Sequence, residues 1–407
     1  MAEPTTEMLR KLGLELGLTA VGVAEAAIAE PARTVLHLRR RAGLAGDMQF
    51  TYRNPDRSTD PSRRLPTAST VVVGALRYES EAPGVGSVSP TASSSSAGRP
   101  TTEMPAIDRA GRIARYVWHD HYARLEAILD LLADLLIDAG YRAHVLIDSN
   151  HQVDRHVAWR AGIGWYGKNA NLLLPGAGSW FVLGSILTDA PLRPAESPQV
   201  DGCGSCQRCI DDCPTGAIVA PGVVDARRCL AWLVQAGGEL PSEYRVAVGD
   251  RIYGCDDCQE VCPPNRAQAP RPAEIEPRID LEWLLTASDE AILDRHGRWY
   301  IADRNVDVVR RTGLVALGNT ARPDWGRGVV ELIRRHLDGQ SDLLRNHAVW
   351  AARRLGLDIE LPRCCSAPIN PTGTAAASPG RCVDPDLHRE LRQPVDARFT
   401  PGDWESF

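Results

Sequence analysis

Apolar residues recur along the chain with two different periods, and the alternation between them predicts the order of helices and strands. Near the start, residues 7–16 carry apolar side chains at helical spacing and lead into a short apolar run at 20–24, which predicts a helix followed by a strand. Helices and strands that alternate in this way over residues 1–200 predict one α/β domain. Its later elements are expected to be strands at 70–75, 143–147 and 180–187 and an amphipathic helix at 125–136.

Three other stretches do not follow this pattern. Residues 87–102 are dominated by Ser, Pro, Thr and Gly, so we expect an exposed loop inserted in the first domain. Residues 201–265 are rich in Gly and Pro and hold too few apolar residues to fold without metal. Helical spacing returns within residues 266–360 and predicts three helices packed as a repeat-like array, while the tail, 361–407, is expected to be loosely ordered.

Composition narrows the class of protein. Hydrophobic residues make up 43% and charged residues 24%, which is typical of a globular protein and excludes a disordered or fibrous chain. There is no run of about 18 uninterrupted apolar residues and no N-terminal signal pattern, so we expect a cytoplasmic protein without a membrane partner. The net charge of -6 argues against indiscriminate binding to nucleic acid, but residues 304–356 contain ten Lys or Arg against five Asp or Glu, a local net charge of +5.

Eight of the eleven cysteines lie between residues 203 and 262. In a reducing compartment such a cluster favours metal ligands over disulfides. The first motif, C-x2-C-x2-C-x3-C-P, is the run found in bacterial two-cluster ferredoxins, in which the fourth cysteine binds the other cluster. By the same geometry, the last cysteine of the second motif, C-x2-C-x3-C-P, is predicted to bind the cluster of the first motif. The predicted ligands are Cys203, Cys206, Cys209 and Cys262 for one [4Fe-4S] cluster and Cys213, Cys229, Cys255 and Cys258 for the other.

Structural zinc is the alternative for these cysteines, because paired C-x2-C units also bind tetrahedral zinc. The C-x3-C-P endings, which zinc ribbons do not need, favour iron and sulfur. Cys364, Cys365 and Cys382 in the tail lack such spacing and are expected to be thiols without a function. Two neighbouring clusters form an electron relay, and about 60 to 80 residues suffice to hold them, so we expect the electron acceptor in the preceding domain.

Two segments of the chain resemble the epoxyqueuosine reductase family: residues 148–169, which include Asp148, Asp154-Arg155 and the run RAGIGWYGKN, and residues 254–263, GCDDCQEVCP. The resemblance extends from the N-terminal helix to about Gly356. It implies an α+β protein with a nitroreductase-like α/β domain that binds cobalamin, a bacterial two-cluster ferredoxin module and C-terminal HEAT-like helical repeats. The chain differs from the family at residues 149–152, where the family usually has small residues and proline.

The family reaction is the reduction of epoxyqueuosine to queuosine at the tRNA wobble position, with cob(I)alamin fed by two [4Fe-4S] clusters. The resemblance therefore implies two partners, the anticodon stem-loop of tRNA and an external electron donor such as flavodoxin or ferredoxin. Asp148 matches the family's proton donor, and an apolar, cofactor-covered pocket would raise its pKa; the alternative role of Asp148 is a turn or cap residue. The positions matched to corrin contacts are Arg57, Arg155, Lys168, Leu172, Leu183 and Asp256.

Three functions compete at this point. The first is the tRNA reductase, in which Arg310, Arg311, Arg334 and Arg335 of the basic helical array would bind phosphates; the alternative for these arginines is an ordinary solvated helix face. The second is a related corrinoid iron-sulfur reductase that acts on a small molecule. The third is a ferredoxin-like electron-transfer protein without a corrin. Cobalamin binding separates the third function from the others, and tRNA binding separates the first from the second.

Overall fold

The computed structural model describes residues 3–78, 109–266, 278–357, 393 and 395–398. The predicted loop at 87–102, Cys364, Cys365, Cys382 and most of the tail lie outside the described residues. The chain forms two compact units, the first from residues 1–103, 114–229 and 256–275 and the second from residues 104–113, 230–255 and 276–407. The segment predicted as a ferredoxin module, 201–265, is thus shared between the two units.

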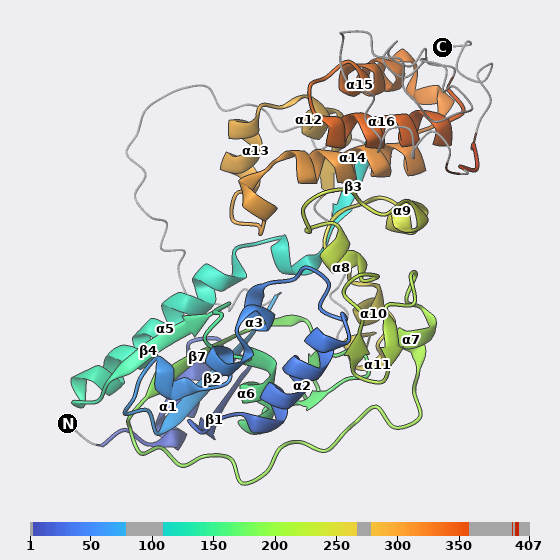
Figure 1. Ribbon diagram of the computed structural model, residues 1–407. Coiled ribbons are helices and arrows are strands. Elements are labelled where there is room, and N and C mark those ends of the chain that lie inside the picture. The colour runs from blue at the N-terminus through green and yellow to red at the C-terminus, as the bar shows by residue number, and fades with distance from the viewer. Residues whose placement is uncertain (1–2, 79–108, 267–277, 358–392, 394, 399–407) are drawn as a thin grey trace, which may run out of the picture. The chain divides into compact units, whose positions relative to one another are not determined.

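A four-stranded sheet with the order β1-β2-β7-β4 forms the centre of the first unit (Figure 1). All three strand pairings are antiparallel. The sequence predicted an α/β domain, but the antiparallel pairings make this part of the chain an α+β arrangement. The prediction missed this because the alternation of helices and strands along a sequence does not determine strand direction. The strands are β1 (Ala20–Glu25), β2 (Thr70–Arg77), β4 (Ala143–Ile147) and β7 (Phe181–Thr188), close to the predicted ranges.

Helices cover both faces of this sheet. Successive side chains of a strand point to opposite faces, so Val72 and Leu76 of β2 join the core under α1 (Thr6–Glu15) and α5 (His121–Asp138). Val71 and Val73 join the core on the other face, together with α6 (Asp154–Arg160). The two central strands are buried along almost their whole length for this reason.

Short elements complete the first unit and carry the predicted iron-sulfur segment. They are α2 (Glu30–Arg41), α3 (Phe50–Arg53), α4 (Pro55–Ser58), η1 (Pro61–Arg63), η3 (Arg115–Val117), β5 (Trp165–Tyr166), β6 (Leu172–Leu173), α7 (Arg208–Asp211), β8 (Ile218–Ala220), β9 (Val223–Val224), α10 (Asp257–Glu260) and α11 (Pro263–Arg266).

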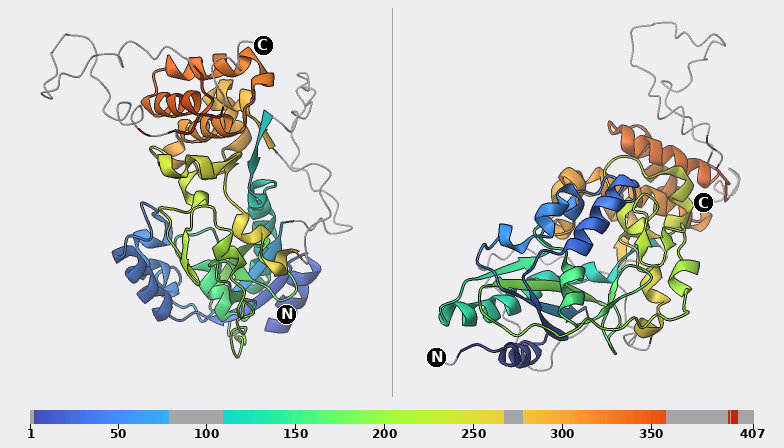
Figure 2. Two further views of the ribbon diagram at one scale, coloured as in Figure 1. Left: turned by 90° about the vertical axis from the view of Figure 1, so that its right-hand side faces the viewer. Right: turned by 60° about the horizontal axis from the view of Figure 1, so that its bottom comes forward.

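The second unit combines a small sheet, of order β10-β3-β11, with a layer of helices. The three predicted C-terminal helices are present as α14 (Asp307–Thr320), α15 (Arg327–Leu337) and α16 (Asp342–Arg354), which pack side by side (Figure 2). No helix among the described residues is long and apolar enough to cross a membrane. The other elements are β3 (Ala110–Ile113), α8 (Leu230–Leu233), α9 (Ser242–Val248), β10 (Arg251–Tyr253), β11 (Arg278–Asp280), α12 (Leu281–Thr286), α13 (Asp289–His296), η4 (Ala302–Arg304) and η5 (Pro323–Trp325).

Two of the four arginines predicted to bind phosphates are buried in this unit. Arg311 is 0% exposed, and its guanidinium donates hydrogen bonds to the carbonyls of Leu233 (2.7 Å) and Ala236 (2.6 Å). Arg310 is 9% exposed and forms an ion pair with Asp289 at 2.6 Å. The phosphate-binding prediction is therefore wrong for both, because α14 is enclosed by its neighbours. Arg334 and Arg335 of α15 are exposed.

The few described residues of the tail contact the helical layer. The backbone N–H of Arg398 donates to the carbonyl of Arg354 in α16 at 2.7 Å. Its guanidinium donates to the carbonyl of Ala321, just after α14, at 3.1 Å. This part of the tail is therefore attached to α14 and α16.

Candidate functional site

Asp148, the predicted proton donor, directly follows β4 at the edge of the sheet. Its backbone φ of 43° lies in the left-handed region, which Asp tolerates better than most residues. The turn that follows is tied to α4, because the hydroxyl of Ser58 donates to the carbonyl of Asn150 at 2.7 Å. Asp148 is exposed, yet partial loss of hydration raises the pKa of its carboxyl, the direction that an acid working at neutral pH needs.

A second carboxyl, Asp154, lies at the start of α6. Burial raises its pKa to about 7, and the negative charge of Asp148 adds to the effect. Gln152 orients this carboxyl, since its side-chain amide donates to Asp154 Oδ1 at 3.3 Å and to Ser185 Oγ of β7 at 2.6 Å. The sequence assigned no role to Asp154. The one sequence feature that could have pointed to Asp154 is its place in the segment that resembles the family.

Asp256 and Arg155, both predicted as corrin contacts, act on a common neighbour, Tyr78. Asp256 is 9% exposed, its Oδ2 accepts the backbone N–H of Arg115 at 2.7 Å, and burial raises its pKa to about 6. Burial and the charge of Asp256 raise the pKa of Tyr78 well above its usual value, while Arg155 opposes the shift. Asp256 and Arg155 are therefore brought to one place by the fold.

Aromatic rings surround Tyr78. It stacks on His121 with ring centroids 5.2 Å apart, and the guanidinium of Arg115 lies 4.7 Å from the ring centroid of Trp180. Neither Tyr78 nor Trp180 was singled out from the sequence, because an aromatic residue at a strand end carries no signal that distinguishes a site from a core. The cluster gives the region around Asp256 a rigid apolar wall.

The neighbourhood of Arg57 fits a large cofactor that carries amide and phosphate groups. Arg57 lies on α4, and its buried Nε has no hydrogen-bond partner among the described residues; the same holds for Nδ1 of His151. Burial lowers the pKa of His151, and the charge of Arg57 lowers it further. Leu172 is 2% exposed on β6 and Leu183 is half-buried on β7, so both offer apolar surface. A corrin ring with amide arms requires unpartnered polar groups and apolar surface of these kinds.

Four of the predicted cluster ligands come together in the first unit. Burial raises the pKa of the Cys262 thiol to about 11, and the nearby thiols of Cys203, Cys209 and Cys206 raise it further. Burial likewise raises the pKa of Cys209, with added contributions from Cys203 and Cys206. Cys262 belongs to the second motif, so its thiol comes close to the thiols of the first motif only through the fold. All eight predicted ligands are half-buried.

The second predicted ligand set is divided along the chain, because the boundary between the units falls between Cys255 and Asp256. Within the first unit, Cys213 Sγ accepts the backbone N–H of Ala217 at 3.1 Å. The carbonyl of Cys258 accepts the amide of Asn169 at 3.1 Å. No group of three or more described His, Cys, Asp or Glu side chains is placed to hold a metal ion.

Polar side chains attach the iron-sulfur segment to the sheet-bearing part of the first unit. Lys168 donates from Nζ to the carbonyl of Gly204 at 2.7 Å, between two predicted ligands. Asn265 is 1% exposed, and its Oδ1 accepts the backbone N–H of Ser179 at 2.6 Å. Gly178 makes this contact possible: its φ is +67°, and a Cβ there would lie 2.0 Å from Asn265 Oδ1.

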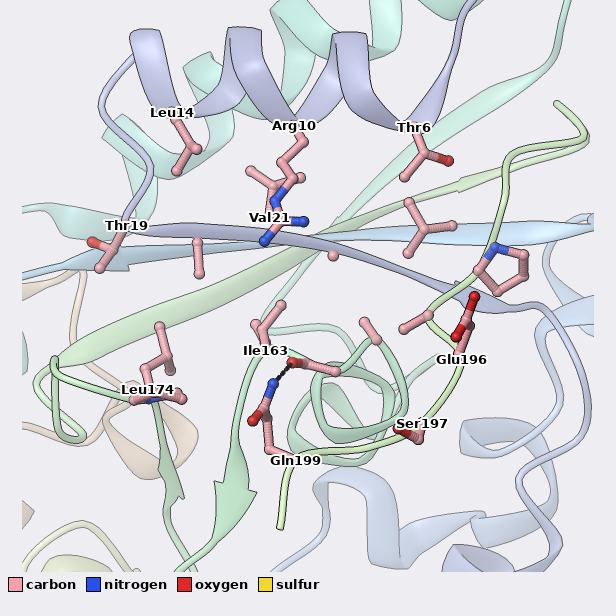
Figure 3. A pocket seen from close by; sticks show the side chains of 18 of the residues that line it. Thr6, Arg10, Leu14, Thr19, Val21, Ile163, Leu174, Glu196, Ser197 and Gln199 are labelled. Carbon is pink, nitrogen blue, oxygen red and sulfur yellow. Dashed lines mark hydrogen bonds between the residues drawn. The ribbon is translucent and has the colours of Figure 1, made fainter. Parts of the chain in front are cut away.

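A cavity of about 580 Å³ opens elsewhere in the first unit, between α1, β1 and residues 193–199 (Figure 3). Arg10 points toward it from α1, and Gln199 donates to the carbonyl of Gly162 at 3.0 Å along its wall. Strands β1 and β4 are the opposite edges of the sheet, so this cavity and Asp148 lie at different edges. No predicted site residue lines it.

Comparison with known proteins identifies the family. Residues 202–265 match the family described as "4Fe-4S double cluster binding domain". The epoxyqueuosine reductase of Bacillus cereus is 32% identical over 84% of this chain and 87% of its own length, and that of Vibrio cholerae is 32% identical over 87% and 93%.

Solved structures agree with the curated relatives. A crystal structure of epoxyqueuosine reductase with an epoxyqueuosine-modified tRNA-Tyr stem loop matches with a TM-score of 0.73 and 29% identity, over 86% of this chain and 90% of the other. The Bacillus subtilis enzyme, with its catalytic aspartate loop swung out of the active site, matches with a TM-score of 0.70 and 30% identity, over 85% and 88%. The two clusters are therefore [4Fe-4S] rather than zinc sites, and the chain, an oxidoreductase of mixed helix and sheet structure, belongs to the epoxyqueuosine reductase family.

Proposed function

We propose that this protein reduces epoxyqueuosine to queuosine at the wobble position of tRNA, with cobalamin and two [4Fe-4S] clusters as cofactors. The observation that carries the proposal is Asp148, a solvent-reachable carboxyl with a raised pKa that directly follows β4 in a member of this family. The structural relative that holds an epoxyqueuosine-modified stem loop supports tRNA as the substrate. The reaction takes place in the cytoplasm.

The chemistry divides between cofactor and protein. Conversion of an epoxide to an alkene takes two electrons and two protons, breaks both carbon-oxygen bonds and releases the oxygen as water. When bound, cobalamin supplies a strongly reducing, nucleophilic cobalt centre. Asp148 supplies a proton at the departing oxygen, and general acid catalysis of this kind is worth about 10²- to 10⁴-fold in rate.

The first unit holds the corrin in this proposal. Arg57 offers its unpartnered Nε to an amide or phosphate group of the cofactor, and Leu172 and Leu183 offer apolar contact. Arg155 and Asp256 approach from the side of Tyr78. Lys168, through its bond to Gly204, connects the corrin site to the iron-sulfur segment. This unit is the nitroreductase-like domain of the family.

Two clusters deliver the electrons. The electrostatic proximity of Cys262 to Cys203, Cys206 and Cys209 supports the crossed ligand assignment for one cluster. Cys213, Cys229, Cys255 and Cys258 bind the other. An external carrier such as flavodoxin or ferredoxin supplies the electrons, one at a time. Residues 201–265 thus act as a ferredoxin module.

The helices α14, α15 and α16 form a HEAT-like array that binds tRNA. Arg334 and Arg335 remain as phosphate ligands, because both are exposed on α15.

The test is anaerobic reconstitution of the full chain with iron, sulfide and cobalamin, followed by assay on an epoxyqueuosine-containing anticodon stem-loop. We expect about eight iron and eight sulfide per chain, bound corrin, and queuosine as the product. Clusters without bound corrin would point to a plain electron carrier. Bound corrin without conversion of the stem-loop would point to a small-molecule reductase. Either result would contradict the proposal.

A further inference from the structure

We propose that Thr215 is a positioning residue for the second cluster, the one assigned to Cys213, Cys229, Cys255 and Cys258, because its hydroxyl fixes the segment that carries Cys229 beside Cys213. The inference rests on the ligand sets of the proposed function and not on its substrate. Cys229 lies outside both cysteine motifs, so the fold has to bring it to the cluster. The contacts of Thr215 show how the fold does this.

Thr215 lies between the two segments of the first unit that carry Cys213 and Cys229. It is 8% exposed, and its Oγ1 donates to the carbonyl of Arg228, directly before Cys229, at 2.6 Å. The same Oγ1 lies 3.9 Å from Cys213 Sγ. One hydroxyl is therefore bonded to the residue before one predicted ligand and lies close to the sulfur of another. Because the residue is buried, water does not readily replace this bond when it is lost.

The hydroxyl cannot serve both acceptors, because it has a single proton. The carbonyl of Arg228 is at normal hydrogen-bond length, whereas 3.9 Å to a sulfur is too long for a strong bond. Cys213 Sγ instead accepts the backbone N–H of Ala217 at 3.1 Å. Thr215 therefore acts on the cluster through the placement of Cys229, while Ala217 donates to the sulfur of Cys213.

A series of backbone hydrogen bonds links the same two cysteines through the β8–β9 hairpin. Ala217, whose N–H donates to Cys213 Sγ, accepts the N–H of Asp225 on its carbonyl at 2.8 Å. The carbonyl of Asp225 in turn accepts the N–H of Cys229 at 3.1 Å. The hairpin thus returns the chain toward Cys213, and Thr215 adds a side-chain bond that closes the loop.

The residues around this loop suit the contact. Gly216 has a φ of +58°, which lets the chain turn sharply between Thr215 and β8 at no steric cost. The carboxylate of Asp225 accepts the backbone N–H of Arg227 at 3.0 Å and its guanidinium at 2.7 Å. The Asp225 side chain therefore binds within its own turn, whereas Thr215 binds across the loop.

A threonine with an ordinary structural role bonds differently. Thr320 of α14 donates its hydroxyl to the carbonyl of Ala316, one helical turn earlier, at 2.8 Å, and so joins two residues of one helix. Thr215 donates to a carbonyl 13 residues further along the chain. Thr320 is therefore a matched control, because its hydroxyl makes the same kind of bond away from the predicted cluster ligands.

The test compares Thr215→Val, Thr215→Ser and Thr320→Val in the full chain loaded with both clusters. Valine keeps the branched shape without the hydroxyl, and serine keeps the hydroxyl. After an iron chelator is added, electron paramagnetic resonance of reduced samples follows the loss of each cluster. In Thr215→Val we expect the second cluster to be lost about 3- to 10-fold faster, as one hydrogen bond implies, and the other cluster at the wild-type rate. Thr215→Ser and Thr320→Val should lose both clusters at the wild-type rates.

Three results would overturn the proposal: wild-type loss of the second cluster in Thr215→Val, equal acceleration for both clusters, which would show that the hydroxyl only stabilises the fold, or no rescue by serine. A Thr215→Val chain that loads only the other cluster would support it.

Cys229→Ala tests the ligand set separately. If this variant keeps an undisturbed second cluster, the ligand set fails and the proposal fails with it. If it disturbs the second cluster while Thr215→Val behaves as the wild type, the proposal alone fails.

Discussion

Three carboxyls of the first unit, Asp148, Asp154 and Asp256, have raised pKa values, and in each case burial is the main cause. A folded protein gains nothing in stability from such groups at neutral pH, because their ionised forms are poorly hydrated. Carboxyls with raised pKa values gather at functional sites more often than elsewhere, and this supports the proposed function. Asp148 also has a left-handed backbone conformation.

The raised pKa of Asp154 predicts a stability change with a definite sign. The folded state binds the proton more tightly than the unfolded state, so the carboxyl stabilises the fold least where both states are ionised, above about pH 7. Asp154→Asn should raise the free energy of unfolding by roughly 1 to 3 kcal/mol at pH 8 and leave it nearly unchanged at pH 4. Denaturant unfolding at both pH values measures this. A variant that is less stable at pH 8 would show that the carboxylate has a structural role.

Some of these residues could be predicted from the sequence and others could not, for physical reasons. Asp148 could be proposed from the sequence because it follows a recognisable strand in a segment that resembles a family, and its role stays a prediction. Asp154 and Tyr78 were missed because their properties come from burial and from neighbours far along the chain. Arg311 was misread because a charge count cannot reveal that backbone carbonyls of residues 233 and 236 enclose its guanidinium.

Among the elements, the iron-sulfur segment shows how local motifs and the fold combine. The first motif sets three thiols at a spacing that suits one cubane, and the fold brings the thiol of Cys262, from the second motif, near them. Asn265 and Gly178 anchor the end of the segment beside Ser179. The motifs could be predicted from spacing alone, whereas the anchoring contacts join residues that are far apart in the sequence.

Crossed ligation predicts which cluster each cysteine variant damages. Cys262→Ser should disturb the cluster built on Cys203, and Cys213→Ser should disturb the cluster that includes Cys229. Electron paramagnetic resonance of the reduced protein, which distinguishes the two clusters, is the measurement. Iron and sulfide content serve as the control for overall loading. Damage confined in each variant to the cluster of its own motif would contradict the crossing.

The helical elements of the second unit contain a buried neutral histidine. His347 of α16 is 0% exposed, its Nε2 accepts the backbone N–H of Leu240 at 3.2 Å, and its Nδ1 donates to the carbonyl of Leu343 at 2.7 Å. Burial, followed by the charge of Arg245, lowers its pKa well below the usual value. A proton on Nε2 would break the bond to Leu240.

Because His347 is buried in its neutral form, we expect the protein to lose stability in acid. Below about pH 6.5 the unfolded state binds a proton that the folded state excludes, so stability should fall by up to about 1.4 kcal/mol for each pH unit. His347→Gln keeps a donor and an acceptor but cannot titrate, and it should reduce this slope. Denaturant unfolding between pH 7 and pH 5 provides the comparison. Identical slopes in the two proteins would count against the buried neutral form.

For the whole molecule, the distribution of charge matters more than the total of -6. The basic excess of residues 304–356 includes buried arginines that serve the fold, so only part of it is available to a ligand. Arg334 and Arg335 lie on the exposed side of α15. The basic surface of this region is therefore smaller than the count of its charged residues suggests.

We expect tRNA to bind more weakly when the charges of Arg334 and Arg335 are removed. The double variant Arg334→Gln/Arg335→Gln should lower stem-loop affinity at low salt and reduce the slope of log affinity against log salt by roughly one to two, as expected for one or two lost phosphate contacts. Fluorescence anisotropy over a salt series measures both quantities. Lys11→Gln on the exposed face of α1 is the control. Unchanged affinity and slope in the double variant would remove α15 from the tRNA site.

The central claim is that Asp148 supplies a proton to a cobalamin-dependent reduction on tRNA. The most direct measurement is single-turnover formation of queuosine in an epoxyqueuosine-containing stem-loop by wild type and Asp148→Asn, with the corrin absorption spectrum recorded on the same samples. An amide is nearly isosteric with the carboxyl but cannot donate a proton at neutral pH. We predict unchanged corrin binding and reduction in the variant, with turnover lowered by about 10²- to 10⁴-fold. Turnover close to that of the wild type would contradict the account.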